Sequence, residues 1–298
     1  MRVAVIDVGS NTARLLVANV TVGGAVLPVD EERAYLRLGA EIERKGKIGR
    51  KKLEEASSTC RAFAAVADEH DAERVAVFVT APGRQGSAGA DLTDTLADAT
   101  SAPVRVLTAE EEGRLAYDGA LARAGGGLPG VVAVVDVGGG STEIAVGTPS
   151  LGAAWVRSAD LGSLRLTRAC LEHDPPTRAE IAAARDAVAG ALDDLKPPSP
   201  DLALAVGGSA RALAKIAGRR FDADEPDRTA KLLSRRPAAK AARSFGIGPE
   251  RAETLLAGAL LLAGASRALG AELVLGQGGV REGAALALAG AEVAARAA

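Results

Sequence analysis

The stretch VVDVGGGST, residues 134–142, decides the fold. Its apolar residues predict a buried strand that ends at the acid Asp136, and three glycines follow at the turn. The phrase VAVVDVG at 132–138 is nearly repeated as VAVIDVG at 3–9, so Asp7 stands in the first half where Asp136 stands in the second. Such a repeat predicts two similar units in one chain.

The composition fits two domains and excludes a general attraction to nucleic acid. The chain has 298 residues, of which 48% are hydrophobic and only 2% aromatic, so the cores must consist of alanine, valine and leucine. With 36 basic and 38 acidic residues, the net charge is −2. Any bound anion must therefore be held by local geometry rather than by the charge of the whole protein.

Cysteine usage and the apolar segments predict a cytoplasmic protein. Cys60 and Cys170 lie far apart and no C-x-x-C is present, which argues against a zinc site or a disulfide framework. Asp7 interrupts the first apolar run, so no signal peptide is expected, and the longest apolar stretch, 255–265, is too short to span a membrane. We expect no nucleic-acid or membrane partner, and a homodimer is left open.

Both halves show the same order of predicted elements: two strands joined by a glycine turn, a third strand, and then strands alternating with helices. In the first half we predict strands at 2–8, 13–20, 25–38, 74–80 and 103–107, and helices at 50–68, 91–101 and 109–124. In the second half we predict strands at 131–137, 143–147, 153–161, 202–208 and 272–276, and helices at 178–195, 209–218, 253–270 and 280–297. The charged, proline-interrupted stretch 221–240 predicts loops or short helices.

The glycine-rich segment 125–130 is the predicted linker. It gives domain boundaries of 1–124 and 125–298, with the last helix able to pack back on the first domain. We expect two α/β domains that face each other across a cleft, so that both D-x-G turns reach the same ligand.

The glycine turns have the chemistry of phosphate-binding loops. Glycines allow a close approach of the backbone, whose N–H groups converge on an anion, and hydroxyl side chains add donors. An acid at the end of a buried strand is costly, and Asp7 and Asp136 would repel phosphate unless they hold a divalent metal or position the attacking water. The expected phosphate-binding residues of the two turns are Ser10, Asn11, Thr12, Gly138, Gly139, Gly140, Ser141 and Thr142.

Two ordinary strand–turn–strand hairpins are the alternative interpretation. The retention of both acids and of the small polar residues in two copies favours binding. Neither turn is a Walker A motif, because no G-x-x-x-x-G-K-[ST] is present. Neither is a dinucleotide fingerprint, because a strand rather than a helix follows the glycines.

Longer blocks resemble the exopolyphosphatase / guanosine pentaphosphate phosphatase (Ppx/GppA) family, within the actin/Hsp70/sugar-kinase superfamily. The resemblance covers nearly the whole chain, matches the short form of the family, and implies two duplicated actin-like (ribonuclease H-like) α/β domains facing across a cleft. The blocks are IDVGSNTARLLV (6–17), LRLG (36–39), TAEEEGRLAYDGA (108–120), VVDVGGGSTEIAVG (134–147), AVGGSARALA (205–214) and GGVREG (278–283).

The resemblance also implies catalytic and metal-binding roles for acids. Glu112, in the EEGR block, matches the acid taken as the base that activates water. Asp136 and Glu143 would be further catalytic acids and, together with Asp7, would hold Mg²⁺ or Mn²⁺. The alternatives are that 110–112 are solvated acids at a helix N-terminus and that Glu143 is a surface carboxylate on a strand.

Arg14 matches a family arginine and would neutralise phosphate oxygens; the alternative is an ordinary exposed residue of a strand. Arg84 aligns with a second family arginine and is also expected to bind phosphate. Around Arg84 the sequence departs from the family pattern: Ala81 stands where the family usually has Ser, and GRQGSAG (83–89) lacks the following Asn. Substrate handling at this loop is therefore in question.

A third glycine turn follows the strand predicted at 202–208. Gly207, Gly208 and Ser209 match a family turn that lies near a nucleoside or a distal phosphate. The alternative is a tight strand-to-helix turn without a ligand.

Three other charged features have plain alternatives. The basic run RKGKIGRKK (44–52) would steer a long polyanion toward the cleft, or is a solvated loop and helix start. The pairs His70–Asp71 and His173–Asp174 are expected to be solvated surface residues, because an HD-type metal site needs more ligands than these.

Together these features predict an exopolyphosphatase, which releases orthophosphate from the end of inorganic polyphosphate by metal-assisted in-line attack of water. A guanosine pentaphosphate 5′-phosphohydrolase is the alternative within the family. A kinase of the wider superfamily and a non-catalytic regulator that binds polyphosphate or guanosine tetraphosphate are alternatives of other classes. The retention of Glu112, Asp136 and Glu143 argues against the regulator.

Overall fold

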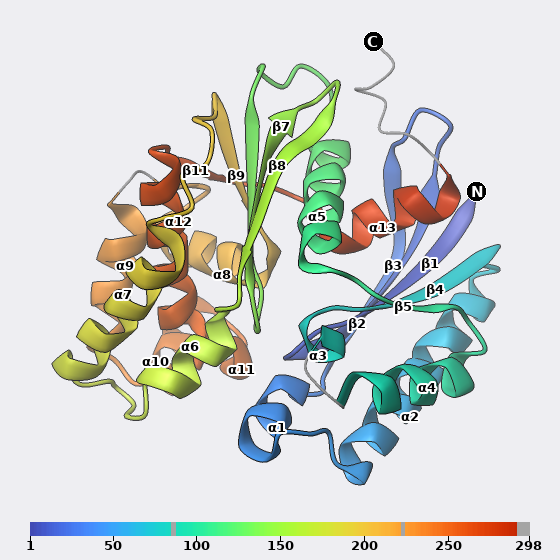
Figure 1. Cartoon of the computed structure of the whole chain (residues 1–298), viewed down its shortest axis with the longest axis horizontal. Helices are drawn as coiled ribbons and strands as arrows, with labels where there is room; N and C mark the ends of the chain where they lie inside the picture. The colour runs from blue at the N-terminus through green and yellow to red at the C-terminus, as the bar shows by residue number, and fades with distance from the viewer. Residues whose placement is uncertain (85–87, 222–223, 291–298) are drawn as a thin grey trace. The chain divides into compact units, whose positions relative to one another are not determined.

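The chain divides into two compact units, each built on its own sheet. The computed structural model describes residues 1–84, 88–221 and 224–290 (Figure 1). One unit consists of Met1–Gly126 together with the segment from Gly278 onward, and the other is Gly127–Gln277. The division falls within the glycine-rich segment 125–130. The segment from Gly278 belongs to the first unit. The expected boundaries counted it with the second domain but allowed the last helix to pack back on the first.

The first unit contains a five-stranded sheet. The two N-terminal pairs, β1–β2 and β2–β3, are antiparallel, while β4 and β5 continue the sheet in parallel from β1. The strand order is therefore β3-β2-β1-β4-β5. The strands are β1 (Arg2–Val8), β2 (Thr12–Val20), β3 (Val26–Tyr35), β4 (Arg74–Val79) and β5 (Val104–Val106).

Helices cover both faces of this sheet, because β1 is apolar on both sides. Alternate residues of a strand point to opposite faces. Ala4, Ile6 and Val8 pack with apolar residues of α2 and α4, whereas Val3 and Val5 pack with residues of α5 and α13. The helices of this unit are α1 (Leu38–Lys45), α2 (Arg50–Glu69), α3 (Ala81–Arg84), α4 (Ala88–Thr100), α5 (Ala109–Ala124) and α13 (Val280–Ala289).

The second unit contains a six-stranded sheet in the order β10-β11-β9-β6-β7-β8. Again the first three strands form antiparallel pairs, and β9 and β11 follow in parallel. The strands are β6 (Val132–Val137), β7 (Thr142–Thr148), β8 (Gly152–Ala159), β9 (Leu202–Val206), β10 (Arg220–Phe221) and β11 (Leu273–Leu275).

Helix α12 (Leu255–Leu269) forms the centre of the second unit's core. It is apolar all around and almost entirely buried, as expected for a helix with neighbours on every side. Its residues join the core with residues of the sheet and of the surrounding helices. Those helices are α6 (Ser163–Cys170), α7 (Arg178–Leu192), α8 (Gly207–Ala217), α9 (Glu225–Leu233), α10 (Ala238–Phe245) and α11 (Pro249–Ala252).

The two sheets have the same topology, which confirms the predicted duplication. Reading β8-β7-β6-β9-β11 beside β3-β2-β1-β4-β5 places equivalent strands in equivalent positions. The long predicted strands and helices are present, within a few residues at their ends. The part of the last predicted helix beyond Gly290 lies outside the described residues. None of the described helices combines the length and the apolar character needed to cross a membrane.

Candidate active site

The first glycine turn joins β1 to β2 and is fixed by the LRLG block. The Gly9 N–H donates to the Thr12 carbonyl at 2.9 Å, and the Gly39 N–H donates to the Ser10 carbonyl at 2.8 Å. A Cβ at Gly39 would lie 2.9 Å from the Ser10 Cβ, closer than real side chains approach. LRLG therefore supports the turn through backbone contacts, and a larger residue than glycine would displace it.

Ser10 has the properties expected of a ligand-binding residue. It is 5% exposed, and among the described residues its buried hydroxyl has no hydrogen-bond partner. Buried polar groups without partners are rare, and each one calls for an explanation. A phosphate oxygen at this turn would supply the missing acceptor. Asn11 beside it is also buried, and Thr12 begins β2.

The second glycine turn repeats the first and is held by α6. The Gly138 N–H donates to the Ser141 carbonyl at 3.0 Å, which is the counterpart of the bond from Gly9 to Thr12. The Ser163 N–H binds the Gly138 carbonyl at 2.9 Å, and the Leu164 N–H binds the Gly139 carbonyl at 2.9 Å. The carbonyl oxygens of the turn thus bond to the start of α6, so they are not aimed at an anion.

Asp136 and Glu143 lie directly opposite each other on β6 and β7. Opposed residues of an antiparallel pair project from the same face of the sheet. Glu143 is 2% exposed, and its Oε1 accepts a hydrogen bond of 2.8 Å from the Ser158 hydroxyl on β8. Glu143 is therefore not the surface carboxylate of the alternative interpretation.

In the first unit the equivalent pair is Asp7 and Arg14, which are opposed on β1 and β2. The duplicated hairpins thus carry an acid–base pair in one unit and two acids in the other. Two neighbouring carboxylates repel each other unless a cation or proton is shared, and oxygen ligands suit Mg²⁺. The donor set of Asp136 and Glu143 therefore fits a divalent cation better than Asp7, which faces an arginine.

The third glycine turn lies against Asp136. Gly207 has a φ of 82°, and a Cβ there would overlap the Asp136 carboxylate, so this position requires glycine. Gly207 also begins α8, whose positive N-terminal end is favourable for a nearby carboxylate. Ser209 is fully buried, and its hydroxyl binds the Val137 carbonyl at 3.2 Å. Ser209 thus ties α8 to β6 in the structure.

One cation near this turn was not anticipated from the sequence. A Cβ at Gly208 would lie 2.5 Å from Nη2 of Arg251, which belongs to the short helix α11. No repeat or motif pointed to Arg251, because its position depends on how α11 packs on α8. It adds a guanidinium, the side chain best suited to bind phosphate, to the turn.

Three successive acids begin α5 and have three different environments. Glu110 is exposed and pairs with Arg114 one turn later. Glu111 completes a capping box with Thr108, and the hydrogen bond from the Thr108 N–H lowers the pKa of its carboxyl. Glu112 is only 8% exposed. The alternative of solvated acids therefore describes Glu110 but not Glu112.

Arg84 binds Glu112. Its Nη1 donates to Glu112 Oε2 at 2.8 Å and to the Leu107 carbonyl at 2.9 Å. The side chains of Arg84 and Glu112 are 23% and 11% exposed, so the ion pair is largely shielded from water. Arg84 was expected to contact phosphate directly; here its partner is the predicted base. Residues 85–87 of the divergent GRQGSAG block lie outside the described residues.

The comparison with known proteins decides the family. The model of the Ppx/GppA phosphatase family matches residues 16–292. The chain belongs to the Ppx/GppA phosphatase family. As a member of this family it is a phosphatase-type hydrolase, and it has the family's duplicated actin-like fold.

Relatives of the family include two named exopolyphosphatases. Exopolyphosphatase 1 of Mycobacterium tuberculosis is 32% identical over 293 residues, which cover 92% of this chain and 84% of the relative. Exopolyphosphatase 2 of the same organism is 36% identical over 201 residues, which cover 64% of this chain and 62% of the relative.

Solved structures of the Ppx/GppA family are also similar. The crystal structure of the Aquifex aeolicus family member has a TM-score of 0.82 at 26% identity, and covers 96% of this chain and 97% of that chain. An exopolyphosphatase from Cytophaga hutchinsonii has a TM-score of 0.86 at 21% identity, with coverage of 98% and 99%. At this identity the second likeness shows the fold alone.

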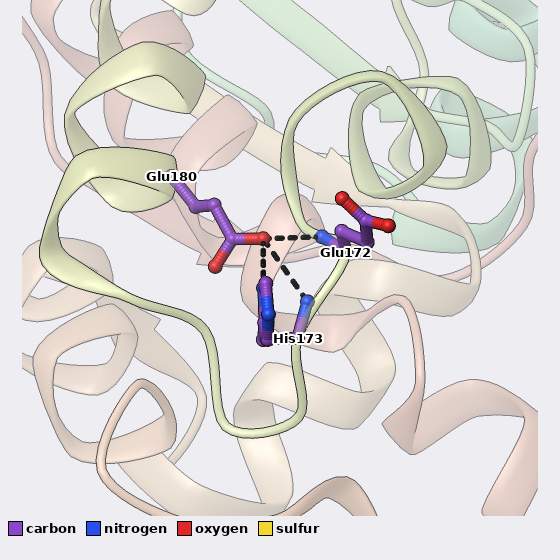
Figure 2. A group of neighbouring side chains, drawn as sticks. All are labelled: Glu172, His173 and Glu180. Carbon is purple, nitrogen blue, oxygen red and sulfur yellow. Dashed lines mark hydrogen bonds and ion pairs between the residues drawn. The ribbon is translucent and has the colours of Figure 1, made fainter.

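A second cluster of metal-ligating side chains is structural. Glu172, His173 and Glu180 lie close together at the start of α7 (Figure 2). Glu180 Oε1 accepts hydrogen bonds from the N–H groups of Glu172 and His173 and from His173 Nδ1, while Oε2 accepts from the Thr177 N–H. This carboxylate is the capping residue of α7, and its oxygens are already occupied by donors.

The remaining charged features form local contacts. His70 Nε2 lies 2.8 Å from Asp30 Oδ2, and Asp174 accepts hydrogen bonds from the N–H that begins α10. Several cations of the basic run 44–52 form ion pairs with acids one helical turn away. That pairing reduces the charge the run could offer to a polyanion, and its role in steering stays a prediction.

Proposed function

We propose that this chain is an exopolyphosphatase, which hydrolyses the terminal phosphoanhydride of inorganic polyphosphate and releases orthophosphate. The observation that carries the proposal is the buried Glu112, a carboxylate held by Arg84 in a chain 32% identical to a named exopolyphosphatase. A positioned carboxylate of this kind can take the proton of an attacking water.

In the proposed reaction, Glu112 accepts a proton from water while the water oxygen forms a bond to the terminal phosphorus. The bond from that phosphorus to the bridging oxygen breaks, and the shortened chain leaves with the electron pair. Arg84 donates a 2.8 Å hydrogen bond to Glu112 Oε2 and so fixes the orientation of this carboxylate. The proposed role of Glu112 as the base rests on this positioning.

The glycine turns would bind the phosphates. Backbone N–H groups of both turns, the Ser10 hydroxyl and the Arg14 and Arg251 guanidiniums are the proposed donors. Asp136 and Glu143, with Asp7 as a further candidate, are the proposed ligands of Mg²⁺ or Mn²⁺. A divalent ion supplies charge screening for the phosphates when it is bound.

The test is orthophosphate release by the purified chain from inorganic polyphosphate and from guanosine pentaphosphate, each with Mg²⁺, with Mn²⁺ and with EDTA. We expect release from polyphosphate, and its loss with EDTA. Release from guanosine pentaphosphate alone would establish the alternative activity in the family instead. Tight binding of polyphosphate or guanosine tetraphosphate without any turnover would establish the regulator, and nucleoside diphosphate formation that needs a sugar or acid acceptor would establish the kinase.

A further inference from the structure

A hollow of about 580 Å³ lies between helices α7 and α9 of the second unit, which run along one side of that unit in Figure 1. Its lining from α7 consists of Arg178, Ile181 and Arg185, which follow the spacing of one helical face. From α9 and its ends, the lining includes Asp227, Lys231 and residues at the same helical spacing. None of the lining residues belongs to the glycine turns.

Cations outnumber acids in this lining. It contains the cations Arg178, Arg185, Arg228, Lys231 and Arg235, and the acids Asp224 and Asp227.

Part of this charge is already compensated by neighbours. Asp227 binds Arg185 through one oxygen at 2.5 Å and Arg267 through the other at 3.0 Å. Arg228 pairs with Glu225 on the same helix. These pairs fix the walls of the hollow, but they leave its remaining cations uncompensated.

Arg178, Lys231 and Arg235 are the cations that remain. All three are exposed, and none forms an ion pair within the part of the chain that the structure describes. They come from both walls, with Arg178 on α7 and the other two on α9 or directly after it. A ligand held by all three must therefore carry several negative charges spread over its length.

An oligophosphate has this distribution of charge. One guanidinium group can donate two parallel hydrogen bonds to the oxygens of one phosphate, and the ammonium of a lysine adds a compact positive charge. The volume is in the range of small-molecule sites, about 300–1,000 Å³, so it suits a short chain of phosphates. Ile181 and Ala230 add apolar surface to the lining, along which the stems of the arginines can lie.

We propose that the hollow between α7 and α9 binds an oligophosphate through Arg178, Lys231 and Arg235, as a second site apart from the glycine turns. Among extended anions, we choose an oligophosphate because the proposed function acts on polyphosphate, so this part of the proposal rests on that function. Two sources share this chemistry: a distal segment of inorganic polyphosphate and the phosphate group of a nucleotide. For a long chain, the second site raises affinity because both sites act on one molecule.

The experiment is calorimetric titration of the full chain with tripolyphosphate and, separately, with guanosine tetraphosphate, in EDTA without divalent ions. This readout registers binding whether or not the chain hydrolyses either compound, so it fails independently of the proposed function. The test variant is Arg178→Gln/Lys231→Gln/Arg235→Gln. We expect it to bind one fewer tripolyphosphate per chain, or to bind it at least about tenfold more weakly.

Two further variants separate charge from structure. The first control, Arg219→Gln/Lys240→Gln/Arg243→Gln, also removes two arginines and one lysine, but from exposed positions of the second unit outside the hollow. It should bind both probes like the wild type. Arg178→Lys/Lys231→Arg/Arg235→Lys keeps the charges and should keep binding.

The titrations decide between the outcomes. If the test variant loses binding of tripolyphosphate but keeps binding of guanosine tetraphosphate, the ligand is the polyphosphate chain. If it loses binding of guanosine tetraphosphate but keeps binding of tripolyphosphate, the ligand is a nucleotide. Wild-type binding of both probes by the test variant, or equal loss in the first control, would overturn the proposal.

Discussion

Glu112 differs from the two acids before it in what surrounds its carboxylate. Glu110 and Glu111 are balanced by residues one turn away on their own helix or at its cap, whereas Glu112 is shielded from water and bound by Arg84 from another element. A buried carboxylate is costly without a cation and hydrogen bonds. The pair is thus a requirement of the fold as well as part of the proposed catalytic site.

We predict strong coupling between these two residues in a double-mutant cycle. Arg84→Gln alone leaves the buried Glu112 carboxylate without its guanidinium, so it should lower the free energy of unfolding by about 2–3 kcal/mol. Adding Glu112→Gln should recover part of this loss, because no buried charge is then left. Urea unfolding of the four proteins should give a coupling energy of about 1–3 kcal/mol, and additive effects would show that the pair contributes nothing.

At the scale of elements, the site depends on close approaches of backbone to side chain. Gly207 and Gly218 stand at opposite ends of α8, and both have a left-handed φ, of 82° and 83°. They differ in surroundings: nothing lies within 4 Å of a Cβ at Gly218, whereas a Cβ at Gly207 would overlap Asp136. Substitution of Gly218 is therefore a control for substitution of Gly207: the backbone strain is similar, but the overlap with Asp136 is absent.

We predict that Gly207→Ala damages both stability and activity, while Gly218→Ala affects stability alone. Each substitution should cost about 1–3 kcal/mol in backbone strain. At Gly207 the overlap should add about 1–3 kcal/mol and displace the Asp136 carboxylate. Thermal unfolding and orthophosphate release measure the two effects. Equal activity in the two variants would mean that the contact of Gly207 with Asp136 is not needed.

The cap of α7 gives a prediction about pH. The Glu180 carboxylate raises the pKa of His173 above its usual 6.5, and the hydrogen bond from His173 lowers that of Glu180. A raised histidine pKa stabilises the fold fully below about pH 6.5, and this stabilisation is lost as the pH rises through the raised value.

His173→Asn should therefore lower the free energy of unfolding more at about pH 5.5 than at about pH 9, with Glu180 ionised at both. The difference should be small because the pair is exposed. Urea unfolding at both values measures it, and a pH-independent effect would refute the coupling.

Some elements of the fold can be predicted from local sequence signals, and others depend on contacts between residues distant in sequence. β1, β2, β6 and β7 were predicted because β-branched runs and glycine turns are local signals. Helix α6 was missed: no side chain caps it, and its first N–H groups bind carbonyls of the β6–β7 turn. Such a helix depends on contacts distant in sequence. The pairing of Arg84 with Glu112 and the place of Arg251 are non-local in the same way.

At the scale of the whole molecule, the first unit is built from both ends of the chain. Ala284 and Leu286 of α13 are buried in its core, and Arg281 donates to the Leu15 carbonyl on β2 at 3.0 Å. The helix packs on α5 by direct backbone contact at Gly119 and Gly283. The sequence indicated only that the last helix could pack on the first domain, because a local sequence pattern does not determine which element a helix packs against.

We predict that Ala284→Asp destabilises the first unit and that Ala287→Asp, on the exposed face of the same helix, does not. A buried charge without a partner should cost about 3 kcal/mol or more. Hydrogen exchange should show lost protection in β1 and β2 of the Ala284 variant. Full protection of these strands would show that α13 is dispensable for the unit.

The most direct measurement of the central claim is orthophosphate release from inorganic polyphosphate with Mg²⁺ by Glu112→Gln, beside Glu110→Gln as the matched control. We predict that Glu112→Gln still binds polyphosphate but releases orthophosphate at least about 100-fold more slowly, because the base is lost. Glu110→Gln should release it at the wild-type rate. Release at the wild-type rate by Glu112→Gln would contradict the assignment of the base.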